Sequence, residues 1–122
     1  MATIMVVDDE ESLRELIIAL FGQEGYKVIA VSSGQECLDA LKAAKPDLIL
    51  MDMMMPGMSG RETTERIRQN PETKDLKIAF LTAARFSESG KGTLTELRVL
   101  DYIPKPFDNE ELVKKVKRFA EQ

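Results

Sequence analysis

Short apolar runs alternate with longer amphipathic stretches along the chain of 122 residues. Five of these runs predict β-strands, and the first, third and fourth are almost entirely apolar, as in strands buried on both faces of a sheet. No linker, low-complexity tract or internal repeat separates them, so we expect one domain over residues 1–122. The predicted strands are Thr3–Val7, Lys27–Val31, Leu48–Met51, Ile78–Leu81 and Asp101–Ile103.

The stretches that follow the strands predict helices. Leu13, Leu16, Ile17 and Leu20 recur at helical spacing, and so do the apolar residues of the last stretch. Capping boxes, in which a Ser, Thr or Asp is followed three residues later by a Glu, mark five expected helix starts. These boxes are Ser12/Glu15, Ser33/Glu36, Ser59/Glu62, Thr93/Glu96 and Asp108/Glu111.

Five strands alternating with five capped helices predict an α/β fold, a doubly wound (βα)5 parallel sheet. Right-handed crossovers place helices on both faces of such a sheet. In the flavodoxin-like strand order 2-1-3-4-5, the first and third strands are neighbours at the topological switch point. Ligands bind there, outside the carboxyl ends of the strands.

Composition narrows the possible functions. The net charge of −4 argues against direct binding of nucleic acid, and we interpret Lys114, Lys115, Lys117 and Arg118 as the solvated face of the last helix. Cys37, the single cysteine, lies in an apolar helical pattern and is predicted to be a core residue. The absence of histidine excludes a His-based triad or metal site. No apolar run approaches the ~20 residues of a membrane span and no signal-peptide pattern is present, so we expect a soluble, cytoplasmic protein.

Polar residues stand at the carboxyl ends of the strands nearest the switch point. Asp8 and Asp9 follow the first strand, Asp52 the third, Thr82 the fourth and Lys105 the fifth. Because parallel strands end at one edge of the sheet, we expect these side chains to lie close together. Any one of them alone is a common loop or capping residue, whereas the set of five favours a single site.

The residue types in this set suit phosphoryl transfer. Asp52 is a carboxylate nucleophile that is ionised at neutral pH. Mg²⁺ prefers oxygen ligands, and we expect Asp9 and Asp52 to bind it directly and Asp8 through water. Lys105 supplies a positive charge for one phosphoryl oxygen, and the hydroxyl of Thr82 donates a hydrogen bond to another.

Several motifs together resemble the receiver domains of two-component response regulators, in particular single-domain chemotaxis regulators. The resemblance covers essentially the whole chain and rests on Val6–Glu10, Leu50–Gly60, Leu81–Ala83 and Asp101–Phe107. It implies that Asp52 is the phosphoacceptor and that the backbone carbonyl of Met54 is a further Mg²⁺ ligand. It also implies that Thr82 and Tyr102 couple phosphorylation to a change of shape, and that the Lys105–Pro106 peptide bond is cis.

The same resemblance implies the partners of the chain. A histidine kinase or a histidine phosphotransfer protein acts upstream. The target is a protein or a fused output domain that contacts the face made by the fourth helix, fifth strand and fifth helix. The domain is a signalling phospho-acceptor that catalyses only its own phosphotransfer and autodephosphorylation. The alternative is a degenerate receiver that binds proteins independently of phosphorylation.

Three positions deserve separate expectations. Receivers often carry Gly-Ala before the fifth strand, whereas this chain has Arg98-Val99, so Arg98 must repack or point outward. In receivers, a methionine such as Met54 is less usual than a polar residue at this position, whose side chain borders the site. The apolar side chain either slows attack by water on an acyl phosphate or serves only as adaptable loop packing. Two glycines within residues 86–92 predict a weak start to the fourth helix.

Other classes with a related fold or chemistry lack their motifs here. A flavodoxin needs a first loop rich in Ser, Thr and Gly, but this loop carries Asp8, Asp9 and two glutamates. A haloacid-dehalogenase-type phosphatase needs a second Asp two positions after Asp52, where Met54 stands. A dinucleotide enzyme needs Gly-x-Gly-x-x-Gly after the first strand, and this motif is absent.

Overall fold

The computed structural model describes residues 2–83 and 95–121. Within this part of the chain, five parallel strands form one sheet in the order β2-β1-β3-β4-β5, which confirms the predicted fold class and strand order. The fifth strand is shifted by one residue from its prediction, because Pro104 pairs with Thr82 while the Asp101 side chain accepts the N–H of Tyr102. The strands are β1 Thr3–Val7, β2 Lys27–Val31, β3 Leu48–Asp52, β4 Ile78–Thr82 and β5 Tyr102–Pro104.

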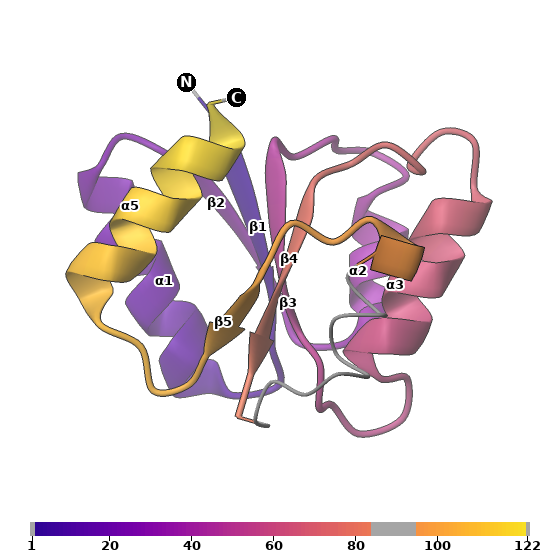
Figure 1. Cartoon of the computed structure of the whole chain (residues 1–122), viewed down its shortest axis with the longest axis horizontal. Helices are drawn as coiled ribbons and strands as arrows, with labels where there is room; N and C mark the ends of the chain where they lie inside the picture. Colours follow the sequence, from indigo (N-terminus) through magenta and orange to yellow (C-terminus); the bar gives the residue numbers. More distant parts are fainter. Residues whose placement is uncertain (1, 84–94, 122) are drawn as a thin grey trace.

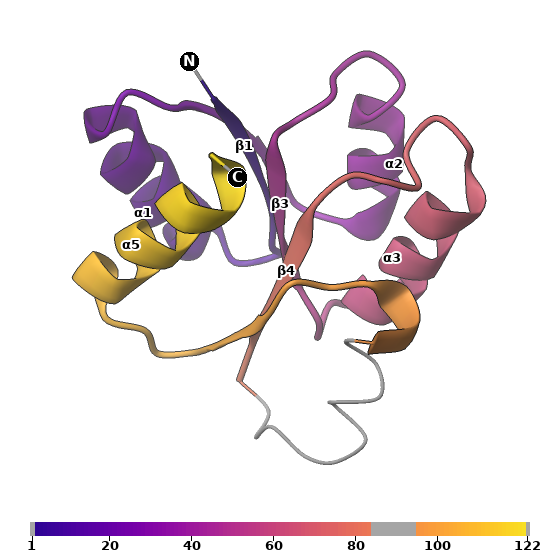
Figure 2. The same ribbon diagram turned by 45° about the horizontal axis from the view of Figure 1, so that its top comes forward.

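Helices cover both faces of the sheet (Figure 1). One side carries α1 (Glu11–Gln23) and α5 (Asn109–Ala120), and the other carries α2 (Gly34–Ala40) and α3 (Gly60–Gln69), an arrangement that the turned view also shows (Figure 2). Residues 95–97 are helical, whereas the predicted weak start at 86–92 and the Thr93 cap lie outside the described residues. In the described part of the chain, no helix combines the length and apolar content that a membrane span requires.

The sheet divides the core into two layers. Ile4 and Val6 pack with α1 and α5, while Met5 and Val7 point to the opposite face and pack with α2 and α3. Cys37 is fully buried in the second layer, and burial raises the pKa of its thiol to about 12, so it is a core residue as predicted. Because β1, β3 and β4 are buried on both faces, polar residues are admitted only where these strands end.

Three of the predicted helix caps are confirmed. The side chains of Ser33, Ser59 and Asp108 accept the N–H groups of residues three positions later, at the starts of α2, α3 and α5. The box Ser12/Glu15 is wrong, since α1 begins at Glu11 and its N-cap residue forms no side-chain cap bond. The reason is local: Asp8 Oδ1 accepts the N–H of the N-cap residue at 2.8 Å, which turns the chain into the helix before Ser12.

Arg98 adopts the outward orientation that was one of its two expectations. Its φ of 57° lies in the left-handed region that favours glycine. The guanidinium lies at the surface, where it pairs with Asp75 at 3.3 Å and donates to the carbonyl of Lys74 at 2.9 Å. The Arg98 side chain therefore lies outside the core, and the next residue, Val99, is buried in it.

Candidate functional site

Three carboxylates meet at the carboxyl ends of β1 and β3. Asp8, Asp9 and Asp52 each offer one oxygen, and these oxygens lie within 4.8 Å of one another. The pairing of Val7 with Met51 brings the two strand ends side by side. Asp8 and Asp52 are buried and Asp9 is exposed, so the cluster has one side open to solvent.

Lys105 reaches into this cluster from the segment after β5. Its Nζ lies 2.7 Å from Asp8 Oδ2, 3.7 Å from Asp52 Oδ1 and 3.6 Å from Glu10 Oε1. The Lys105–Pro106 peptide bond is cis, as predicted, and the backbone N–H of Lys105 donates to the carbonyl of Thr82 at 2.8 Å. Burial by itself lowers the pKa of Lys105, but the hydrogen bond and charge of Asp8, helped by the other two carboxylates, raise it above its ordinary value.

Asp52 lies in an environment that resists its charge. Burial raises its pKa to about 6, against the hydrogen bond that Oδ1 accepts from the N–H of Met54 at 3.1 Å. The charges of Asp8 and Asp9 raise the pKa further, while Lys105 lowers it. One ammonium against several carboxylates leaves an excess of negative charge. A small divalent cation with a preference for oxygen ligands fits this donor set.

The remaining predicted residues lie around the cluster at different depths. Thr82 is buried at the end of β4, joined by its carbonyl to Lys105. The side chain of Met54 is 69% exposed beside Asp52. Tyr102 lies deeper, buried in the core with its ring stacked on Phe80 at 5.5 Å between centroids. Asp8, Asp9, Asp52 and Lys105 thus form one cluster, whereas Tyr102 packs against Phe80 in the core.

Two contributors to the site were not predicted. Glu10 pairs with Lys105. The sequence placed it in the motif Val6–Glu10 but assigned it no role at the site. Gly60 begins α3 against the carbonyl of Asp52, and an added Cβ there would collide with that backbone. A glycine at the first position of a capped helix was the only available signal, and it did not show which strand the helix would approach.

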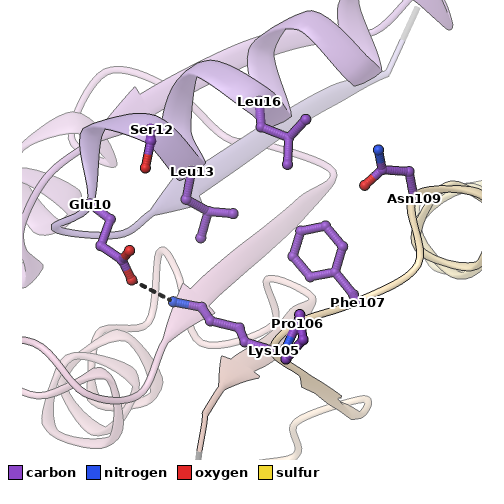
Figure 3. Close-up of a pocket in the computed structure, with 8 residues that line it drawn as sticks. All are labelled: Glu10, Ser12, Leu13, Leu16, Lys105, Pro106, Phe107 and Asn109. Atoms are coloured by element: carbon purple, nitrogen blue, oxygen red, sulfur yellow. Dashed lines mark ion pairs between the residues drawn. The ribbon is translucent and has the colours of Figure 1, made fainter.

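An open groove adjoins the cluster between α1 and the segment after β5 (Figure 3). It has a volume of about 340 Å³. Lys105 stands at one end, paired with Glu10, while Leu13 and Leu16 of α1 face Phe107 across the groove. Its lining is thus apolar away from the site and charged next to it.

Known proteins share this sequence and this fold. The family model described as "Response regulator receiver domain" matches residues 4–117. The phosphate regulon transcriptional regulatory protein PhoB of Pseudomonas aeruginosa is 39% identical over 115 residues, which are 94% of this chain and 50% of that protein. The chain therefore spans about half the length of the curated relatives it matches.

Solved structures agree with this match. The chemotaxis protein CheY4 of Vibrio cholerae is 30% identical, with a TM-score of 0.90 and coverage of 98% of each chain. The receiver domain of a sensor histidine kinase from Pseudomonas aeruginosa is 26% identical, with a TM-score of 0.86 over 99% of this chain and 98% of that one. That structure is described with a magnesium ion coordinated in its active-site cleft. Together, the matched residues and the shared fold show that this chain belongs to the response regulator receiver domains of two-component signalling.

Proposed function

We propose that Asp52 of this receiver domain accepts a phosphoryl group, with Mg²⁺ held by Asp8, Asp9, Asp52 and the backbone carbonyl of Met54. The observation that carries the proposal is the cluster of three carboxylates within 4.8 Å beside a single lysine. A phosphohistidine on a histidine kinase or on a phosphotransfer protein is the donor, in keeping with the family. The exchange takes place in the cytoplasm, as is typical of such domains.

The chemistry of the transfer follows from the residue types. A carboxylate oxygen of Asp52 attacks the phosphorus, an O–P bond forms, and the N–P bond breaks with its electron pair returning to the imidazole. Mg²⁺, when bound, neutralises charge on the phosphoryl oxygens. Lys105 offsets the charge of one such oxygen, and the hydroxyl of Thr82 donates a hydrogen bond to another. Later attack by water returns the carboxylate and releases phosphate.

The raised pKa of Asp52 is compatible with this role. With a value of about 6, the carboxylate is mostly ionised at pH 7 even without the metal. A bound divalent cation favours the ionised form further, because it places opposite charge beside the oxygens.

The groove of Figure 3 adjoins Lys105, and its apolar wall supports docking of the donor protein there.

Signal output rests on the connection from Thr82 to Tyr102. Thr82 is the last residue of β4 and pairs with Pro104, two residues after Tyr102 on the neighbouring strand. A phosphoryl group that draws the Thr82 hydroxyl toward Asp52 changes the packing beneath β5, where Tyr102 stacks on Phe80. The fourth-helix, β5 and α5 face then presents a different surface to a target protein or an output domain.

Intact-mass measurement after treatment with acetyl phosphate and Mg²⁺ tests the acceptor. The wild-type protein should gain one phosphoryl group, and Asp52→Asn should gain none while keeping its circular dichroism spectrum. Asp39→Asn, at an exposed site in α2, is the matched control and should label normally. A folded wild-type protein that gains no mass would favour the alternative, a receiver that binds its partners without phosphorylation.

A further inference from the structure

Met54 combines exposure with proximity to the acceptor. Its side chain is 69% exposed, whereas Met5, Met51 and Met55 are buried. Among the methionines that the structure describes, it is the only one classed as exposed. The backbone N–H of Met54 donates to Asp52 Oδ1 at 3.1 Å, so this exposed side chain starts next to the acceptor. We propose that Met54 is an oxidation site for peroxides, and that its sulfoxide shortens the lifetime of the phosphoryl group on Asp52, an inference that rests on the proposed function.

Hydrogen peroxide is the only reagent that the step requires, and the protein contributes only the sulfur of Met54. The sulfur lone pair of Met54 attacks one peroxide oxygen, an S–O bond forms, and the O–O bond breaks. The departing hydroxide takes up a proton and leaves as water. The oxygen now on sulfur loses its proton to solvent, which completes the sulfoxide. The sulfur is oxidised by two electrons and the peroxide is reduced. Access governs which methionine reacts, so exposure selects Met54 among the methionines within residues 2–83.

The loop that carries Met54 is held on both sides of it. The N–H of Met53 donates to the carbonyl of Leu81 at 3.0 Å, and the carbonyl of Met53 accepts from Gly60 at 3.0 Å. The N–H of Met54 itself donates to Asp52 Oδ1 at 3.1 Å. The backbone that bears the side chain is tied to the acceptor and to β4, so a polar group added to Met54 lies within one side-chain length of Asp52.

Oxidation changes what the side chain offers to water. A thioether is a weak acceptor and its carbons exclude ordered water, whereas a sulfoxide oxygen is a strong acceptor. A water molecule held by that oxygen lies beside the acyl phosphate from which water removes the phosphoryl group. One added hydrogen bond of this kind should speed hydrolysis by about three- to tenfold.

The test compares phosphoryl lifetimes before and after oxidation. Wild-type protein is treated with dilute hydrogen peroxide, quenched, mapped by peptide mass spectrometry and then phosphorylated with acetyl phosphate and Mg²⁺. After removal of the donor, intact mass follows the loss of phosphoryl groups. We expect oxygen on Met54 ahead of Met53, Met55 and Met58, and a half-life about three- to tenfold shorter than that of untreated protein. Methionine sulfoxide reductases should restore the original half-life.

Two variants separate the role of this side chain from other oxidation. Met54→Leu keeps the backbone carbonyl and the volume but has no sulfur, so peroxide should leave its half-life unchanged. Met54→Gln carries an amide acceptor and should show a short half-life without any peroxide. A phosphorylated wild-type protein whose half-life ignores oxidation of Met54, or a Met54→Leu protein that responds as the wild type does, would overturn the inference alone. Untreated protein that takes no phosphoryl group would overturn the proposed function, and this inference with it.

Discussion

The two ends of the parallel sheet each hold a partly buried cation, and the partners of the two cations differ. At the carboxyl ends of the strands, Lys105 faces the carboxylates of Asp8 and Asp52. At the amino ends, the guanidinium of Arg68 in α3 donates hydrogen bonds to neutral carbonyl groups of the backbone. The first cation stands in an excess of opposite charge, while the second completes the hydrogen bonding of two connecting segments.

Arg68 uses its planar fork of donors to join those segments. It donates to the carbonyls of Leu97 and Arg98 before β5, at 2.8 and 3.2 Å, and to those of Lys74 and Leu76 before β4, at 2.8 and 2.7 Å. Burial lowers the pKa of Arg68, and the nearby charge of Arg98 lowers it further. An arginine suits this place because it stays charged and offers donors in several directions.

The two ends of the sheet therefore serve different purposes, the Arg68 end stability and the Lys105 end reactivity. The Arg68 end supplies donors to carbonyl groups of two connecting segments, so its interactions should contribute mainly to the free energy of unfolding. The Lys105 end keeps repelling carboxylates together, so its groups cost stability and create a place for a cation and a phosphoryl group. Mutations at the two ends should therefore respond differently to Mg²⁺.

The largest expected effect is that of Arg68→Ala. Removing the guanidinium leaves four carbonyl groups without this donor, and we expect the free energy of unfolding to fall by about 3 kcal/mol, equally with and without Mg²⁺. Urea unfolding followed by circular dichroism measures it. Arg66→Ala, in the same helix but paired only at the surface with Glu62, should cost about 0.5 kcal/mol. Equal losses in the two variants would contradict the proposed role of Arg68.

Lys105→Ala should cost somewhat less and should depend on the metal. Without Mg²⁺ the fully buried Asp8 loses a partner at 2.7 Å, which we expect to lower the free energy of unfolding by about 2 kcal/mol. Mg²⁺ should reduce this deficit, since a divalent cation replaces the missing charge. The same urea experiments in EDTA and in magnesium chloride provide the measurement. If Mg²⁺ did not reduce the loss in the free energy of unfolding, the Lys105 end would behave like the Arg68 end and the proposed difference between them would be wrong.

The pH dependence of stability should reveal the cost of ionising Asp52. Its pKa of about 6 in the folded protein exceeds the ordinary value of 3.8, so the native state holds this proton more tightly than the unfolded state. The stability from this group is complete below about pH 4 and is lost as the pH rises through about 6. In EDTA, Asp52→Asn should therefore be more stable than the wild type at pH 7.5, by roughly 2 kcal/mol, and the difference should shrink at pH 4.5. If the stability difference between Asp52→Asn and the wild type grew toward low pH, the pKa of Asp52 would be lowered on folding rather than raised.

The smallest expected effect is that of Arg98→Gly. Glycine relieves the left-handed backbone at φ 57°, worth about 1 kcal/mol, but it removes the contacts with Asp75 and the Lys74 carbonyl. We expect a net change within about 0.5 kcal/mol. Arg98→Ala loses the same contacts and keeps the backbone conformation, so thermal melts should show it to be the less stable variant. A glycine variant less stable than the alanine variant would mean that the backbone at residue 98 is not strained.

Much of the fold follows from patterns that are local in the sequence. All five strands were predicted to within a residue. The most apolar runs, such as Ile78–Leu81, fit only the centre of a sheet. The caps at Ser33 and Ser59 were predictable because a cap requires only residues a few positions apart. The box at Ser12 failed because a residue outside the box, Asp8, turns the chain earlier.

By itself, the sequence determined the strands and the polar residue at each strand end, since these depend on residue type and short spacing. The strand order followed from the fold class, and the cis peptide before Pro106 followed from the family resemblance. Only the tertiary structure decided which charges meet. Lys105 lies 97 positions from Asp8 in the chain, yet it binds that carboxylate more closely than it approaches Asp52. Likewise, the packing of Gly60 on the Asp52 carbonyl depends on how α3 crosses the end of β3. Distances between groups brought together by the sheet, and the pKa values that follow from them, are properties of the packed molecule, because burial and charge act through space.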